Sequence, residues 1–134
     1  MRFLLDTNIC IYALRDRPRQ VMRRLQTVGR AAVAVSVITV VELRQGADKS
    51  QRPDLNHTAL DDFLEPMSVL PFEERDARAA AQVRAHLERI GRPIGDFDSL
   101  IAAQGLTRDL IVVTNNVEEF ERVPDLGIAN WAED

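Results

Sequence analysis

Phe3-Leu4-Leu5-Asp6-Thr7-Asn8 is a short apolar run that ends at an acid, and three later segments share this pattern. Their acids are Glu42, the pair Asp96 and Asp98, and Glu119. The later segments read Ala34-Val35-Ser36-Val37-Ile38-Thr39-Val40-Val41-Glu42-Leu43, Pro93-Ile94-Gly95-Asp96-Phe97-Asp98 and Ile111-Val112-Val113-Thr114-Asn115-Asn116-Val117-Glu118-Glu119-Phe120. None of the four segments contains Lys or Arg. If the apolar runs are neighbouring parallel strands, the acids converge at one edge of a sheet, where open α/β folds bind their ligands.

Carboxylates gathered without a counter-charge predict a metal site. Like charges at close range cannot all stay ionised unaided, so some must protonate or bind a cation. Oxygen ligands favour Mg²⁺, with Mn²⁺ as a plausible substitute, over zinc. The only cysteine, Cys10, lies in an apolar helical pattern that predicts core packing, and His57 and His86 fall outside the four segments. Zinc chemistry is therefore not expected.

The bulk properties predict one compact unit. A chain of 134 residues fits a single domain, residues 1–134, with one core. The longest strongly apolar stretch, residues 31–41, is too short to span a bilayer, which needs about 20 residues. Asp6 interrupts the first apolar run, which argues against an export signal. We expect a soluble, cytoplasmic protein that does not enter a membrane.

Strand and helix patterns alternate along the chain, which predicts an α/β protein with a parallel sheet. Strands are expected over residues 2–5, 32–35, 68–70, 110–113 and 127–130. Apolar periodicity and helix-ending residues predict helices over residues 7–14, 18–28, 37–47, 73–90, 99–106 and 116–120. Residues 48–56 are polar and contain Pro53, so they are expected to form a loop before one further helix.

Each acid also has a purely structural explanation. Two segments fit capping boxes, in which a Glu reaches back to the N-cap amide, and they are residues 39–42 and 116–119. Asp6 and Asp96 suit helix caps, and Asp98 suits the first turn of a helix, where the dipole favours negative charge. Caps do not explain why all four acids follow apolar runs without basic neighbours. The capping-box explanation is weaker for residues 39–42, because Glu42 lies in a stretch expected to be mostly buried.

Other polar side chains are expected at the same edge. Asp96 and Asp98 diverge if they lie two residues apart on a helix, so one should face the site and the other should cap or support it. Uncharged oxygens and amides there can orient water, phosphate or the acids. They belong to Asn8, Thr114, Asn115 and Asn116.

Arginines crowd the region between the first two acidic segments. A solvated helix face is the favoured interpretation, and contact with phosphate or with an acidic partner is the alternative. The basic residues are Arg15, Arg17, Arg19, Arg23, Arg24 and Arg30, followed after Glu42 by Arg44, Lys49 and Arg52.

In their order and spacing the motifs resemble the PIN-domain ribonucleases, in particular the VapC-type toxins of bacterial toxin–antitoxin pairs. The resemblance covers nearly the whole chain, to Asn130-Trp131. The matching residues are Leu4-Leu5-Asp6-Thr7-Asn8-Ile9, Val41-Glu42-Leu43, Pro93-Ile94-Gly95 with Asp98 and Ile101-Ala102-Ala103, and Val113-Thr114-Asn115-Asn116 with Glu119-Phe120.

The resemblance implies a three-layer α/β/α sandwich around a central parallel sheet, and cleavage of RNA that depends on Mg²⁺ or Mn²⁺. It also implies a homodimer and inhibition by a cognate antitoxin. The catalytic and metal-binding acids would be Asp6, Glu42, Asp98 and Glu119. The family often has a non-acidic residue where this chain has Asp96, and an Asp where it has Asn116. The fourth ligand is therefore open between Glu119 and the amide oxygen of Asn116.

The chemistry of the residues agrees with this assignment. A metal ion bound by carboxylates lowers the pKa of a bound water, and a second ion can stabilise the leaving oxygen. Asp6 and Asp98 are the expected principal ligands. Glu42 is expected to act as a ligand or as the base that orients the water.

Other classes of protein remain alternatives. A receiver-like phosphoacceptor domain needs an acidic pair after the first strand and a late Lys, whereas Asp6 stands alone and Lys49 is the last lysine. A haloacid-dehalogenase-type phosphatase needs a second acid where Asn8 stands. A metal-binding interaction module without turnover is also open, because sequence does not show that the site is assembled.

Overall fold

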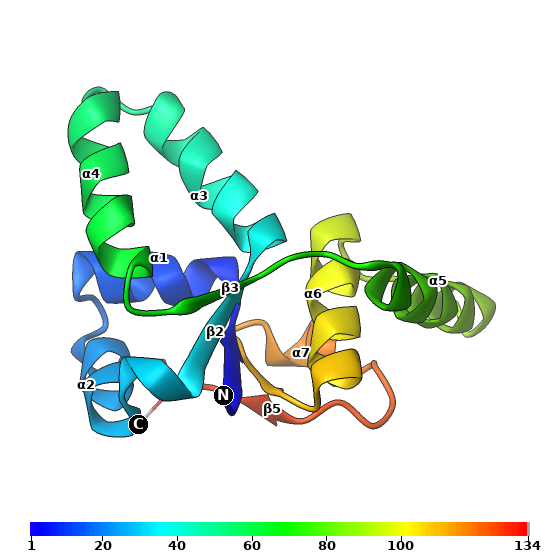
Figure 1. Cartoon of the computed structure of the whole chain (residues 1–134). Coiled ribbons are helices and arrows are strands. Elements are labelled where there is room, and N and C mark those ends of the chain that lie inside the picture. The colour runs from blue at the N-terminus through cyan, green and yellow to red at the C-terminus, as the bar shows by residue number, and fades with distance from the viewer. Residues whose placement is uncertain (134) are drawn as a thin grey trace.

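Five parallel strands form one central sheet in a computed structural model that describes residues 1–133 (Figure 1). The strands are β1 (Phe3–Leu5), β2 (Val33–Ser36), β3 (Ser68–Leu70), β4 (Ile111–Val113) and β5 (Ile128–Ala129), in the order β3-β2-β1-β4-β5. β1 is central, and its Leu4 aligns with Ala34 on one side and Val112 on the other. The predicted parallel α/β sheet is confirmed. The last residue of the expected single domain, Asp134, lies outside the described residues.

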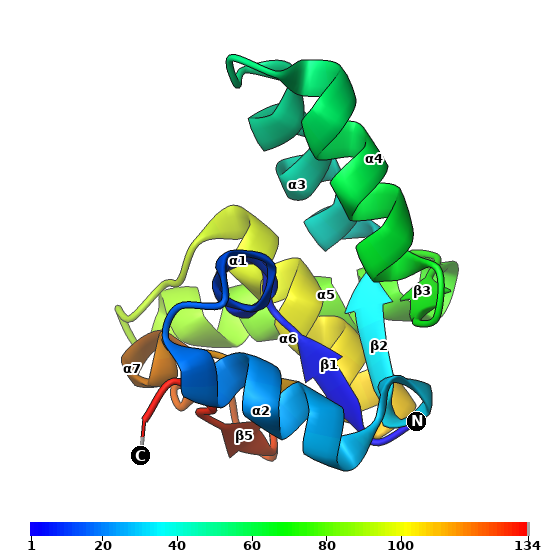
Figure 2. The same cartoon turned by 90° about the vertical axis from the view of Figure 1, so that its left-hand side faces the viewer.

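Helices cover both faces of this sheet (Figures 1 and 2). Because successive side chains of a strand point to opposite faces, each strand contributes to two cores. Phe3 and Leu5 pack on one face with α1 to α4, while Leu4 packs on the other with α5 and α6. The three-layer α/β/α arrangement is therefore confirmed. The helices are α1 (Thr7–Arg15), α2 (Arg19–Val28), α3 (Val37–Asp48), α4 (Pro53–Leu64), α5 (Glu74–Arg89), α6 (Asp96–Arg108) and α7 (Val117–Phe120).

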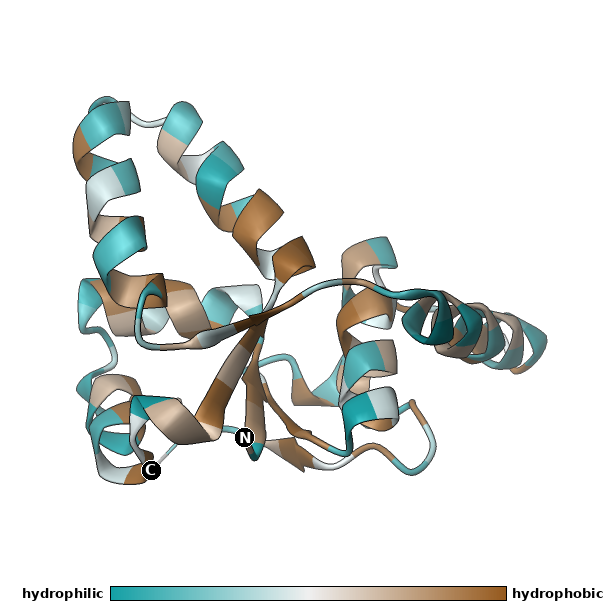
Figure 3. Cartoon of the chain, in the orientation of Figure 1, coloured by the Kyte–Doolittle hydropathy of each residue, from teal (hydrophilic) through white to brown (hydrophobic). Residues whose placement is uncertain are grey.

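The central strands have no polar face. Every residue of β1 and β2 is buried, as expected for parallel strands covered on both sides, and Figure 3 shows their hydrophobic colouring against more polar outer helices. Cys10 is fully buried among the apolar residues of α1, which confirms its predicted packing. Trp131 closes the same core by an edge contact with Phe3, with ring centroids 5.1 Å apart. Within residues 1–133, no helix is long and apolar enough to cross a membrane.

Helix boundaries differ from the predictions at three places. The expected loop over residues 48–56 is shorter, because α4 already begins at Pro53, whose fixed φ suits a first turn. α3 continues through Gly46 to Asp48. α6 begins at Asp96 with Gly95 as its N-cap, so Asp96 does not cap this helix as suggested.

A buried ion pair ties α6 to the start of α5. The Asp76 carboxylate accepts hydrogen bonds from Thr107 Oγ1 at 2.6 Å, from Arg108 Nη2 at 2.9 Å and from the Glu73 amide at 2.8 Å. Burial raises the pKa of Asp76, but these hydrogen bonds and the charge of Arg108 outweigh it, so the pKa lies below its usual value of 3.8. This network fixes the end of α6 that lies opposite Asp98.

Two helical glycines provide a matched test of how closely the helices pack. A Cβ at Gly105 of α6 would lie 2.8 Å from Val112 in the sheet and 2.8 Å from Leu126, whereas a Cβ at Gly46 of α3 would meet nothing within 4 Å. We expect Gly105→Ala to lower the free energy of unfolding by about 1–3 kcal/mol through overpacking. Gly46→Ala should raise it by up to about 1 kcal/mol through helix propensity. Urea denaturation measures both, and equal effects of the two substitutions would contradict the close packing of α6.

The Asp76 network predicts a pH-dependent loss of stability. A carboxyl whose pKa is lowered on folding stabilises the protein above its unfolded pKa and loses this contribution as pH falls through the folded value. Asp76→Asn should lower the free energy of unfolding at pH 7 by about 3 kcal/mol, since it leaves Arg108 without its buried partner. This difference from wild type should shrink below about pH 4. Denaturation curves from pH 7 to pH 3 measure it, and a difference independent of pH would exclude an ionised Asp76.

Candidate active site

The sheet has its topological switch point beside β1. From β1 the chain runs to β2 and β3 on one side and returns to β4 on the other, so a crevice opens at the carboxyl ends of β1 and β4. The Asp6 amide donates to the Val113 carbonyl at 3.0 Å, and Thr114 follows β4 at the same level. The structure therefore brings Asp6 and Thr114 together, as the sequence predicts.

Asp6 is a buried carboxylate with an exposed fraction of only 4%. Its Oδ1 accepts from the Ile9 amide at 2.9 Å and caps α1, and its Oδ2 accepts from Thr114 Oγ1 at 2.5 Å. Burial raises its pKa, these hydrogen bonds partly lower it, and the charge of Glu42 raises it further. Asp6 is thus both a helix cap and a member of the predicted cluster.

Glu42 reaches the same edge from α3. The N-cap of this helix is Ser36, so Glu42 lies in the second turn and the capping box suggested for residues 39–42 is wrong. Its Oε1 accepts from Thr7 Oγ1 at 2.6 Å. Thr7 orients Glu42 but was not among the predicted site residues, although its place directly after Asp6 was a usable signal.

Asp98 and Glu119 come from the first turn of α6 and from α7. Burial, a hydrogen bond with Glu119, and the charges of Glu119, Asp6 and Glu42 raise the pKa of Asp98 to about 7. The Glu119 side chain also accepts from Asn116 Nδ2 at 2.5 Å. The capping box suggested for residues 116–119 is therefore replaced by a contact between the two side chains. We call Asp6, Glu42, Asp98 and Glu119 the acidic edge.

Three predicted supporting residues lie away from these carboxylates or face solvent. The Asp96 side chain is 93% exposed, and its nearest basic atom, Arg84 Nη2, is 4.0 Å away. Asn8 is also exposed. Asn115 is exposed as well and contacts the Tyr12 hydroxyl at 3.2 Å. Of the pair considered from sequence, Asp98 faces the acids and Asp96 does not.

The acidic edge opens into a shallow cavity of about 420 Å³, lined by Glu42, Gly95, Asp96, Phe97 and Asp98. Phe97 is 43% exposed there, a feature that the sequence pattern did not single out. No carboxylate of the edge forms an ion pair within residues 1–133, where the acids in ion pairs are Asp48, Asp61, Glu73, Asp76, Asp96 and Glu118.

The four carboxylates are not gathered around a single position. In the described part of the chain, no three Asp, Glu, His or Cys side chains are grouped closely enough to hold a metal ion. Asp6, Glu42 and Glu119 are instead hydrogen-bonded one by one, to Thr114, Thr7 and Asn116. Binding of a cation at this edge would require these side chains to move closer together.

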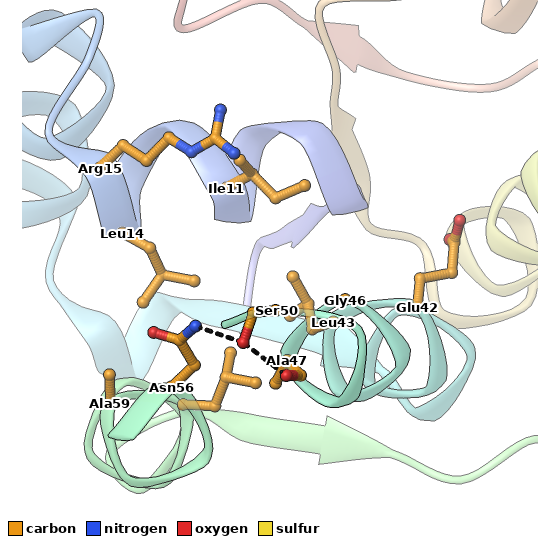
Figure 4. A pocket seen from close by; sticks show the side chains of 11 residues that line it. Ile11, Leu14, Arg15, Glu42, Leu43, Gly46, Ala47, Ser50, Asn56 and Ala59 are labelled. Carbon is orange, nitrogen blue, oxygen red and sulfur yellow. Dashed lines mark hydrogen bonds between the residues drawn. The ribbon is translucent and has the colours of Figure 1, made fainter. Parts of the chain in front are cut away.

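A second depression, of about 370 Å³, lies between α1, α3 and α4 (Figure 4). Glu42 borders it from the second turn of α3, and Arg15 borders it at the end of α1. Between them the walls are mostly apolar side chains such as Ile11 and Leu43. Ser50 joins the two helices of the far wall, because it accepts from Asn56 at 2.8 Å and donates to the Ala47 carbonyl at 2.6 Å.

The sequence matches known proteins over nearly all of its length. The family described as PIN domain matches residues 3–126. The tRNA(fMet)-specific endonuclease VapC of Shigella flexneri is 40% identical over 132 residues, which cover 98% of this chain and 99% of that protein. The ribonuclease VapC2 of Haemophilus influenzae is 39% identical over 132 residues, 98% of each chain.

Solved structures show the same arrangement of elements. The DNA-bound VapBC of Salmonella typhimurium contains a chain with a TM-score of 0.92 and 37% identity, covering 98% of both chains. The VapBC2 of Rickettsia felis, bound to a DNA fragment from its promoter, gives a TM-score of 0.90 at 34% identity, covering 98% of this chain and 99% of that chain.

The raised pKa of Asp98 predicts that the acidic edge destabilises the metal-free fold. A carboxyl that is harder to ionise when folded lowers stability as pH rises from its unfolded pKa to its folded pKa, here from 3.8 to about 7. In EDTA, Asp98→Asn should be more stable than wild type by roughly 1–2 kcal/mol at pH 8, less than the full shift because the carboxyl is partly exposed to solvent.

This advantage should disappear below about pH 3, where Asp98 is protonated in both the folded and the unfolded state. Thermal or urea unfolding over this pH range measures it. Asp96→Asn removes the same charge from an exposed side chain and should leave the pH profile of wild type unchanged. An Asp98→Asn variant that loses stability at every pH would show that the carboxylates do not repel one another.

Proposed function

This chain belongs to the PIN-domain family, which confirms the resemblance of its motifs, and we propose that it is a VapC-type endoribonuclease that requires a divalent metal ion. The observation that carries this proposal is the convergence of four carboxylates on one sheet edge without a basic partner. The relatives named as VapC ribonucleases support it, because they align with 98% of the chain. The receiver-like phosphoacceptor domain that was an alternative from the sequence belongs to a different family.

The residues of the acidic edge suit Mg²⁺ or Mn²⁺. Their donor atoms are all oxygens, and hard cations with high charge prefer such ligands. Burial and the neighbouring carboxylates raise the pKa of Asp98, and a bound cation would relieve the repulsion among these carboxylates. Asp6 and Asp98 are the proposed principal ligands, with Glu42 and Glu119 beside them. When bound, such an ion makes a water more acidic and stabilises negative charge on the phosphate and the leaving oxygen.

The neighbouring hydroxyls and amides hold the carboxylates in place. Thr114 and the Ile9 amide each occupy one oxygen of Asp6, which fixes the rotamer of this side chain. Thr7 holds one oxygen of Glu42 and leaves the other free to accept a proton from the attacking water. Asn116 holds Glu119 in the same way, which favours Glu119 over Asn116 as the fourth ligand.

RNA is the proposed substrate, and a cognate antitoxin is the proposed partner. The RNA follows from relatives that are named as endonucleases or ribonucleases, and the antitoxin follows from the similar chains of Rickettsia felis and Salmonella typhimurium, which belong to VapBC structures. Transfer RNA is the first RNA to test, because the name of the Shigella flexneri relative specifies tRNA(fMet). The homodimer and the cytoplasmic location stay predictions.

RNA cleavage by antitoxin-free protein tests this function. We expect wild type to cut RNA in Mg²⁺ or Mn²⁺ and to stop in EDTA. Asp98→Asn should lower the cleavage rate by at least about 100-fold, because it removes one of the principal ligands of the proposed metal ion. Purified tRNA(fMet) and total cellular RNA serve as substrates, with products resolved on denaturing gels.

The chain provides a matched control in Asp96→Asn, which removes the same charge two residues away from an exposed side chain. This variant should cleave at nearly the rate of wild type. Equal loss of activity in both variants would mean that charge at the start of α6 matters, and not the position of Asp98. Metal binding by a folded wild type that cuts neither RNA would favour the interaction module without turnover.

A further inference from the structure

One region of this chain, residues 7–41, carries an excess of positive over negative side chains. Residues 7–41 contain six arginines and a single acid, Asp16, although the whole chain has a net charge of −4. The rest of the chain therefore carries −9. This basic region lies in the sequence between Asp6 and Glu42, two residues of the acidic edge.

Five of these arginines are exposed at the end of α1, on α2 and in the turn between them. None of their side chains forms an ion pair in the part of the chain that the structure describes. The arginines that do form ion pairs lie elsewhere, and they are Arg44, Arg75, Arg84, Arg108 and Arg122. The exposed five form what we call the arginine patch: Arg15, Arg17, Arg19, Arg23 and Arg24.

Helix stability does not account for the charges on α2. This helix begins with Arg19, has no acid in its first turn and has no basic residue in its last turn, so its charges oppose the helix dipole. Arg19 and Arg23 lie one turn apart, a like-charge spacing that costs about 0.2–0.5 kcal/mol. In contrast, α5 has Glu74 and Asp76 in its first turn and Arg89 in its last. The positions of the arginines on α2 therefore lower the stability of this helix.

The arginine patch is connected to the acidic edge through α1. This helix starts at the cap Asp6 and ends at Arg15, nine residues or about 14 Å later. α2 packs against α1 on the same side of the sheet, as Figure 2 shows. Arg15 also borders the depression that Glu42 borders at the other end (Figure 4). A bound strand of RNA reaches such a distance in roughly two or three nucleotides.

We infer that the arginine patch binds backbone phosphates of the RNA strand that enters the acidic edge. This inference rests on the proposed function. Arginine suits the task, because its guanidinium stays charged and donates paired hydrogen bonds to phosphate oxygens. The patch offsets the repulsion that a polyanion meets at four carboxylates. It would raise affinity without selecting a base sequence, since phosphate contacts position a nucleic acid and base contacts specify it.

The surface of α2 favours a phosphate over a protein as its ligand. Protein interfaces are centred on buried aromatic or aliphatic anchors. The apolar residues Val21 and Leu25 are turned into the core and are fully buried. The exposed residues of α2 are Arg19, Arg23, Arg24, Gln26 and Thr27. Such a face offers charge and hydrogen-bond donors but no apolar anchor.

The test compares two pairs of substitutions with the same change in charge. Arg23→Gln with Arg24→Gln neutralises the patch. Arg78→Gln with Arg89→Gln neutralises two exposed arginines of α5, which lies on the opposite side of the sheet (Figure 1). Both pairs are combined with Asp98→Asn, which prevents cleavage. Binding of tRNA(fMet) is then measured from about 50 to about 300 mM salt, a range of about sixfold in which the affinity of phosphate contacts depends strongly on salt.

We expect the patch variant to bind the tRNA about tenfold more weakly than the parent. The slope of log K against log salt should become smaller by roughly 1–1.5, the value for two phosphate contacts. The α5 variant should match the parent in affinity and slope. The melting temperature of the patch variant should stay equal or rise, because the substitutions remove the repulsion between Arg19 and Arg23. This readout separates loss of contacts from loss of folding.

Unchanged affinity and slope in the patch variant would overturn the inference. So would a variant that binds tRNA normally but binds the cognate antitoxin more weakly, since the patch would then be a protein-docking surface. Cleavage by the otherwise wild-type protein reports separately on the proposed function. If wild type cleaves RNA and the patch variant binds it normally, only the inference fails; if wild type neither binds nor cleaves RNA, both fail.

Discussion

The hydrogen bond from Thr114 to Asp6 joins the ends of the two strands on which the site depends. At 2.5 Å it links the residue after β1 to the residue after β4, across the switch point of the sheet. The same carboxylate caps α1 through the Ile9 amide, so one side chain sets the direction of that helix and the floor of the crevice. A carboxylate that is 4% exposed tolerates this position because three polar partners compensate for its lost hydration.

The other three acids reach the bottom of this crevice from helices in different layers of the fold. α3 carries Glu42 from one layer of helices, while α6 and α7 carry Asp98 and Glu119 from the other. Their approach is unfavourable, since burial and the charges of the neighbouring carboxylates all raise the pKa of Asp98. The folded core and the Asp76 network hold the carboxylates together against this repulsion. Such a conflict between local electrostatics and the fold is expected where a site is built for a ligand and not for stability.

Residues that follow strands were the ones that the sequence predicted best. Asp6 and Thr114 were recognised because apolar runs mark strands, and parallel strands bring their carboxyl ends to one edge. Glu42 was found, but its run is half strand and half helix, so its turn within α3 could not be derived from hydropathy alone. The choice of Asp98 over Asp96 depends on the rotation of α6, which tertiary packing sets. Thr7 was missed because a hydroxyl next to an acid has no periodic pattern of its own.

Within residues 1–133, the acidic edge and the arginine patch lie apart and form no ion pair with each other. An arginine placed beside Asp98 would relieve the repulsion among the carboxylates and would also occupy the position that a cation needs. α1 places about 14 Å between Asp6 and Arg15, which exceeds the screening length of about 8 Å at physiological ionic strength. The two regions therefore interact weakly with each other through solvent. Each remains available to a ligand of the opposite charge, and a phosphate chain with its divalent cations carries both signs.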